Sequence, residues 1–252
     1  MPVDQIEDRF GVNQEYAHLL IPAAIIYKQI LEMTGAEMLW IPGIRMCDGI
    51  AADYAEKQKY LKFTHNFDDD ILSASRNMAK RYRCNTSHGQ KIENYALQIF
   101  DAMKKFHGLG TRERLLLQIA SILHDCGKFI SLRDSSACAY NIIMATEIIG
   151  LSHAEREIVA EVVRCNLDAF RYGEGSIRAG KLTAMLRLAH AMDRSHHGRL
   201  DDGKLQVKGN KLIISTSYAG NLALETMAVE DKADFFEEMF GIRPEIRQKR
   251  RV

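Results

Sequence analysis

The sequence has no strong charge of either sign. Its 34 lysines and arginines nearly balance 33 aspartates and glutamates, so the formal net charge of the 252 residues is +1. Nucleic acids and anionic membrane surfaces attract proteins with a pronounced basic field. We therefore expect neither a nucleic acid nor a membrane as a partner. A short basic run at 247–251 is interpreted as a solvated tail.

Paired cysteines and long apolar runs are also missing. The five cysteines are widely separated and form no C-x-x-C pair, which argues against a zinc knuckle or a redox dithiol. A reduced, cytoplasmic compartment is the expectation. The longest apolar run, at 19–27, has nine residues, whereas a membrane span needs about 20. The first ten residues carry acids and no apolar stretch typical of a signal peptide.

The remaining composition is that of a globular protein of one or two domains, with 46% hydrophobic and 27% charged residues. Residues 13–35 predict a long helix that ends at Gly35. Residues 38–42 predict a short buried strand closed by Pro-Gly, and 46–57 a second helix. Because one strand cannot make a sheet, this αβα unit at 1–57 is expected to need a partner.

The rest of the chain predicts helices followed by a small mixed segment. Five or six helices are expected in 58–200, with boundaries that include a capping box from Ser152 to Glu155. In 201–252 we expect a hairpin of 204–208 and 211–216, a further strand at 221–228 and a helix at 231–240. The run 175–181 resembles a P-loop, but Leu182 replaces its magnesium-binding hydroxyl and no strand precedes it. It is interpreted as a loop before a helix.

Four side chains carry the chemical information. His88 falls on an apolar helical stripe with residues 92, 95, 96, 99 and 103. His124 and Asp125 close the apolar helix 115–123, and Asp193 follows apolar residues at helical spacing. A carboxylate on a buried face must be paired or bound to a cation.

Two histidines and two aspartates in a helical core suit one divalent transition metal. Manganese, iron, cobalt and zinc all accept this donor set, and the sequence does not choose among them. Such an ion lowers the pKa of a bound water and polarises a phosphoryl oxygen. The alternative is that each of the four is an ordinary core residue with a satisfied partner.

The segment Leu123-His124-Asp125-Cys126-Gly127-Lys128 resembles the H-D-x-G-K segment of HD-domain metal-dependent phosphohydrolases. More narrowly, 2–230 resembles the C-terminal part of the exopolyphosphatase/guanosine pentaphosphatase (Ppx/GppA) family. The stretches that carry this resemblance are 81–82, 87–88, 97–101, 107–109, 113–116, 123–131, 147–152, 159–164 and 186–195.

The resemblance implies a mostly α fold with an HD-type helical domain at 58–200. Before it, 1–57 resembles the terminal αβα fragment of an actin-like (RNase H-like) phosphatase domain, through Arg9-Phe10-Gly11, 21–24 and 48–50. After it, 201–252 forms a small β-hairpin and helix. No D-x-G-S-N or G-G-G-S phosphate loop is found, so the family's usual polyphosphate reaction is not expected from this sequence.

Together, residues and resemblance imply a set of site roles. His88, His124, Asp125 and Asp193 would hold one metal ion, and Asp125 and Lys128 would be catalytic. Substrate-binding residues would be Lys128, Arg187 and Arg194. For Lys128 a helix cap, and for the two arginines intramolecular ion pairs, are the alternative interpretations.

Other positions limit the site to one ion. Histidines that could bind a second one are absent from 133–140 and 164–166. His190 is considered as a residue supporting the ligands, and His196-His197 as part of a solvated loop.

Two functional hypotheses remain. The first is a metal-dependent phosphohydrolase that acts on a phosphorylated small molecule or nucleotide. The second is a non-catalytic module that binds nucleotide or polyphosphate, or that dimerises, for an actin-like phosphatase. A homodimer or a missing actin-like domain would then be the partner, and metal content with activity on generic phosphate esters discriminates between the hypotheses.

Overall fold

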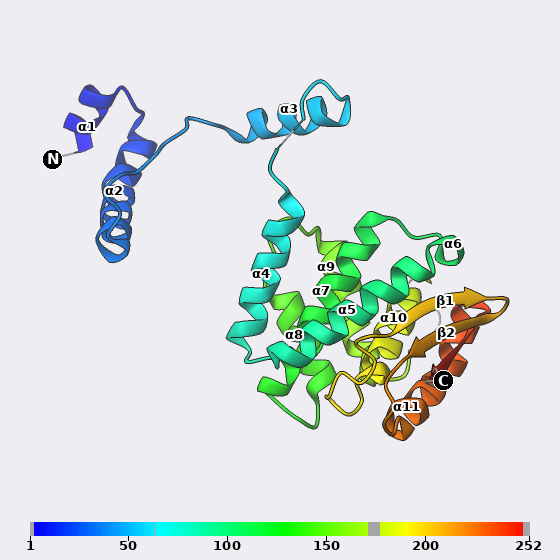
Figure 1. Cartoon of the computed structure of the whole chain (residues 1–252). Coiled ribbons are helices and arrows are strands. Elements are labelled where there is room, and N and C mark those ends of the chain that lie inside the picture. The colour runs from blue at the N-terminus through cyan, green and yellow to red at the C-terminus, as the bar shows by residue number, and fades with distance from the viewer. Residues whose placement is uncertain (1–2, 63, 171–176, 249–252) are drawn as a thin grey trace. The chain divides into compact units, whose positions relative to one another are not determined.

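The computed structural model describes residues 3–62, 64–170 and 177–248 (Figure 1). Backbone contacts divide the chain into two compact units, residues 1–64 and residues 65–252. Among the described residues, no helix is both long enough and apolar enough to cross a bilayer.

The first unit consists of the helices α1 (Val3–Phe10), α2 (Gln14–Thr34) and α3 (Met46–Lys57). The predicted helices at 13–35 and 46–57 are therefore confirmed. The Asn13 side chain caps α2 by accepting the Tyr16 N–H at 3.0 Å, and Gly35 ends it at a φ of 66°. In 3–62, buried apolar side chains are confined to Ile6 and Ala17, so these residues enclose almost no core of their own.

The strand predicted at 38–42 is wrong. These residues are irregular and exposed, and Trp40 keeps 83% of its surface in solvent. A strand needs a neighbour for its backbone N–H and C=O groups, and the described part of the first unit offers no second extended segment. The predicted αβα arrangement is therefore not formed here.

The second unit begins with a helical assembly, as predicted. Its elements are α4 (Phe67–Arg81), α5 (Thr86–Ala102), α6 (Lys104–His107), α7 (Thr111–Leu123), the 3₁₀ turn η1 (Cys126–Phe129), α8 (Ser135–Ala145), α9 (His153–Leu167) and α10 (Ile177–Met192). Helices α5, α7 and α10 pack against one another (Figure 1). Fully buried side chains such as Ile92, Leu117 and Leu186 lie in this core. The run 175–181 is described only from Ile177, where α10 begins.

A three-stranded sheet completes this unit, in the order β1 (Lys204–Lys208), β2 (Lys211–Thr216), β3 (Arg243–Gln248). The predicted β1–β2 hairpin is confirmed, with Lys208 opposite Lys211. The strand predicted at 221–228 is wrong, because α11 spans Ala223–Phe240. Buried Val229, Ala233 and Phe236 give that segment a helical period.

The third strand corrects the interpretation of the chain's end. The sequence pattern predicts no strand at 243–248, and it predicts Arg247 in a solvated tail. Instead β3 pairs in parallel with β2, placing Ile214 opposite Ile246. Helix α11 provides the crossover that a parallel pair requires. Residues 249–251 of the predicted tail lie outside the described residues.

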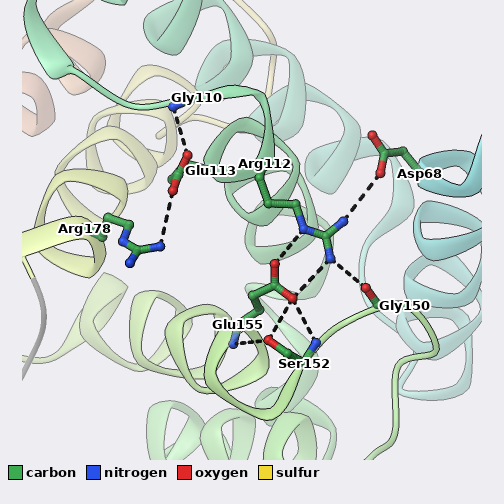
Figure 2. Close-up of polar contacts among 8 residues, drawn as sticks. All are labelled: Asp68, Gly110, Arg112, Glu113, Gly150, Ser152, Glu155 and Arg178. Carbon is green, nitrogen blue, oxygen red and sulfur yellow. Dashed lines mark hydrogen bonds and ion pairs between the residues drawn. The ribbon is translucent and has the colours of Figure 1, made fainter. Parts of the chain in front are cut away.

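A cluster of hydrogen bonds and ion pairs connects the start of α7 to neighbouring elements (Figure 2). Arg112 donates to both carboxylate oxygens of Glu155, at 2.6 and 3.1 Å, and to the Gly150 carbonyl at 2.6 Å. Glu155 also accepts the Ser152 N–H at 2.8 Å, which confirms the capping box predicted there. Asp68 of α4 lies 3.5 Å from the Arg112 guanidinium. One arginine therefore joins the starts of α4, α7 and α9.

Arg112→Met is expected to destabilise the protein by roughly 1–3 kcal/mol at pH 7, since it removes charge-assisted hydrogen bonds from Glu155. The Arg112 hydrogen bonds lower the pKa of Glu155 from 4.5 to about 2. A depressed carboxyl pKa stabilises the fold above the unfolded-state value and loses that contribution as the pH falls from about 4.5 to about 2. The difference between parent and variant should shrink in that window, as measured by urea unfolding at pH 7 and pH 3.

The control is Arg114→Met, on the same helix. Arg114 also makes a double contact, at 2.8 and 2.9 Å, but to the exposed Asp101. Exposed pairs contribute about 0–1 kcal/mol. Equal losses in the two variants, or an Arg112→Met deficit independent of pH, would contradict the bridging role.

Candidate metal centre

The predicted metal ligands come from three helices of the second unit. His88 lies in the first turn of α5, where Asn85 accepts its backbone N–H at 3.2 Å and fixes the start of the helix. His124 and Asp125 follow α7 directly, and Asp193 follows α10. Because α5, α7 and α10 pack together, their ends bring these four residues to one place.

His88 and Asp193 form a buried pair. The His88 Nδ1 lies 2.8 Å from Asp193 Oδ2, and the Gly198 N–H donates to Oδ1 at 2.8 Å. Burial raises the pKa of Asp193, but the hydrogen bonds from His88 and Gly198 lower it further, to below its ordinary value. An ionised carboxylate only accepts, so Nδ1 carries the proton. In a neutral ring Nε2 then carries the lone pair, and this buried atom has no hydrogen-bond partner among the described residues.

His124 is held in the same way by the backbone. Its Nδ1 lies 2.7 Å from the Ser121 carbonyl, which can only accept a hydrogen bond, so Nδ1 is the protonated nitrogen. Burial lowers the pKa of this imidazole, which keeps it neutral. Its Nε2 is buried, has no hydrogen-bond partner within the described part of the chain, and lies 3.4 Å from Asp125 Oδ1. A second lone pair is thus presented to the interior.

Asp125 connects the buried imidazoles with the surface. Its Oδ1 accepts from Lys128 Nζ at 2.7 Å, and the Lys128 side chain is 41% exposed. Burial raises the pKa of Asp125, while His124 and Lys128 lower it more, so that the carboxyl group is ionised at neutral pH. The structure thus places Lys128 at the site, as a partner of Asp125.

His190 is the residue that sequence reasoning underrated. One ring nitrogen from each of His88, His124 and His190 lies within 4.8 Å of the others. Burial, with the neighbouring His124 and His88, lowers the pKa of His190 to about 3, so the ring is neutral. Its position one helical turn before Asp193 was the available signal, because residues three apart share a helix face.

His196 is exposed, as the predicted solvated loop requires, but it also contacts the site. Its ring centroid lies 3.9 Å from that of His88. Nitrogen and oxygen atoms of His88, Asp193 and His196 form a second group within 4.8 Å. The two groups share His88, so they are alternatives around one imidazole and not two independent sites.

These residues fit a divalent transition metal. Two buried imidazole lone pairs without partners are costly unless something binds them. Ligating histidines in proteins usually donate their other N–H to a carboxylate or a backbone carbonyl, which is the arrangement of His88 and His124. Neutral imidazoles with a carboxylate suit zinc, manganese, iron and cobalt alike, so the donors do not identify the metal.

A cavity of about 460 Å³ opens beside the cluster between α9, α10 and α11. Its lining includes His190, Arg187, Arg194, Lys232 and Asn166. Pockets for small ligands generally measure about 300–1,000 Å³. The cavity therefore brings the two predicted substrate arginines close to His190 of the imidazole cluster.

The two arginines differ in their contacts. Arg187 donates to the carbonyls of Cys165, at 2.8 Å, and Asp168, and its guanidinium lies 4.6 Å from the Phe235 ring centroid. Among the described residues, Arg194 has no side-chain hydrogen bond or ion pair. Arg194 is therefore the better placed of the two to meet an anion.

Comparison with known proteins adds the family context. The model of the family "Ppx/GppA phosphatase, domain III" matches residues 72–231. The chain is also 23% identical, over 239 residues, to a guanosine-5'-triphosphate,3'-diphosphate pyrophosphatase of Photobacterium profundum. That alignment covers 91% of this chain and 46% of the relative. The chain thus spans about half the length of the curated relative it matches.

Proposed function

This chain belongs to the Ppx/GppA phosphatase family, and on that premise we propose that it is an HD-type, metal-dependent phosphohydrolase for a phosphorylated small molecule or nucleotide. The observation that carries the proposal is the pair of buried Nε2 atoms of His88 and His124, which have no hydrogen-bond partner among the residues that the structure describes. Asp125, 3.4 Å from His124, adds the negative charge that a divalent cation requires.

One divalent ion at the cluster that includes His88, His124, Asp125 and Asp193 would lower the pKa of a bound water and polarise a phosphoryl oxygen. The chain's own residues supply the rest. Asp125 is ionised and can accept a proton, and Lys128 beside it reaches solvent, where it can meet a phosphate. This arrangement supports hydrolysis of a phosphate ester or anhydride.

The cavity supports an anionic substrate of modest size. Arg194 and Lys232 line it together with His190, so a phosphate bound there lies beside the imidazole cluster. Asn166 contributes a buried Oδ1 that has no partner in 3–62, 64–170 and 177–248, and this atom can accept a hydrogen bond from a substrate N–H or O–H. A nucleotide offers both a phosphate and such donors.

The proposal is tested by orthophosphate release from a panel of substrates. The panel contains nucleoside polyphosphates, guanosine 5'-triphosphate 3'-diphosphate and generic phosphate mono- and diesters, each with Mn²⁺, Co²⁺ or Zn²⁺ and with chelator. We expect metal-dependent turnover of at least one small phosphorylated compound. Binding of a nucleotide with no turnover under any metal would contradict it and favour the non-catalytic hypothesis.

Arg194→Ala is expected to raise KM roughly tenfold for the substrate found, the loss of one charge-assisted contact worth about 1.4 kcal/mol. The turnover number should change little, because the contact is made equally in the ground state and the transition state. Steady-state kinetics measures both quantities. The control, Lys208→Ala, removes a cation on β1 away from the cavity and should leave KM unchanged.

A further inference from the structure

We infer that His190 is a third imidazole ligand of the metal ion, and that Asp193 acts through His88 without touching the metal. The inference rests on the proposed function, because it assumes an ion at the cluster. It changes the composition of the site from two imidazoles and two carboxylates to three imidazoles with Asp125 as the neighbouring carboxylate.

The first argument is that Asp193 already accepts hydrogen bonds from the protein. Both of its oxygens already accept hydrogen bonds, from the His88 ring and from the Gly198 N–H, each at 2.8 Å. The side chain is fully buried. A cation bound to either oxygen would have to share that oxygen with a hydrogen-bond donor already in place. As it stands, Asp193 fixes which His88 nitrogen carries the proton and turns the other to the interior.

The second argument is the position of His190. Its ring is 5.6 Å from the His88 ring and 5.7 Å from the His124 ring, while those two are 5.4 Å apart, as measured between centroids. The three rings are thus nearly equidistant, and one nitrogen of each lies within 4.8 Å of the other two. A small cation among three such nitrogens has one ligand on each side, a donor set that zinc and related ions use with an open position for water.

The alternative group of His88, Asp193 and His196 is less suited. It depends on the Asp193 carboxylate, whose two oxygens each already accept a hydrogen bond. It also needs the exposed His196, held on a loop with a left-handed φ of 59°. In the three-imidazole group, by contrast, His88 and His124 each bring a buried Nε2 that has no other partner.

The test compares three variants of the full chain loaded with Co²⁺, namely His190→Ala, Asp193→Asn and His196→Ala. The readouts are the Co²⁺ visible absorption bands, which report the ligand atoms, and the Co²⁺ affinity by competition with a chelator. We expect His190→Ala to shift the bands and to weaken binding most. Asp193→Asn should keep the band positions and weaken binding by about 10–100-fold, as expected for a residue that orients a ligand. His196→Ala should keep both.

The controls distinguish a variant that fails to fold from a failure of the inference and from a failure of the proposed function. Thermal unfolding of each metal-free variant shows whether it folds, and His190→Gln, which keeps the side-chain volume nearer to that of histidine, replaces the alanine variant if it does not. Shifted bands in Asp193→Asn or His196→Ala, with unchanged bands in the His190 variant, would overturn the inference and leave the proposed function standing. A parent chain that binds no Co²⁺ would overturn both.

Discussion

His124→Ala is expected to bind no metal and to lose at least about 10³-fold in phosphohydrolase activity, which is about 4 kcal/mol of transition-state stabilisation. The substitution removes the buried Nε2 that lies 3.4 Å from Asp125. Without an ion in the site, nothing would lower the pKa of a water molecule there towards neutrality. Elemental analysis and orthophosphate release measure the two effects on the same sample.

A matched histidine serves as the control. His153 lies at the exposed start of α9, and its ring contacts the Arg156 side chain at 3.2 Å. His153→Ala should keep the metal content and activity of the parent. Retained metal and activity in His124→Ala, with a native circular dichroism spectrum, would show that this imidazole is an ordinary core residue.

Gly127→Ala is expected to destabilise the protein by about 3 kcal/mol or more, because there is no room for a methyl group. A Cβ at this position would lie 1.8 Å from the Ser135 carbonyl oxygen and 2.6 Å from the Ala139 nitrogen. Both are backbone atoms of α8, so they cannot move aside as a flexible side chain would. Equilibrium unfolding in urea measures the loss.

Gly89→Ala is the matched control, one residue after His88 in α5. A Cβ there meets no atom within 4 Å. Alanine is favoured over glycine within a helix by about 1 kcal/mol, so this variant should be as stable as the parent or more so. A loss below about 1 kcal/mol in Gly127→Ala, no larger than an ordinary substitution causes, would mean that α8 does not pack against η1 as described.

Helices were predictable where local signals were strong. The cap at Asn13 with Gly35, and the capping box at Ser152, set the ends of α2 and α9 through contacts between residues close in sequence. The strand at 38–42 was wrong because apolar composition alone does not supply a pairing partner. The strand β3 was not predicted because its pairing partner β2 is distant in the sequence, with α11 between the two strands.

The sequence located most of the side chains that the structure brings together, but not the hydrogen bonds between them. Helical periodicity located His88 and Asp193 on inward faces, and the H-D segment marked His124 and Asp125. The sequence did not show that both Asp193 oxygens accept hydrogen bonds, one from His88 and one from Gly198. Nor did it show that His190 joins the imidazoles, because that depends on how the ends of three helices meet.

Metal content per chain tests the central claim most directly. The purified chain is loaded with Mn²⁺, Co²⁺ or Zn²⁺ and freed of excess ion. Its bound metal is then measured by elemental mass spectrometry. We predict about one ion per chain, because one imidazole cluster is present among the described residues and both candidate groups share His88. No bound metal on folded protein with any of the three ions, or equal content in parent and His124→Ala, would contradict the account.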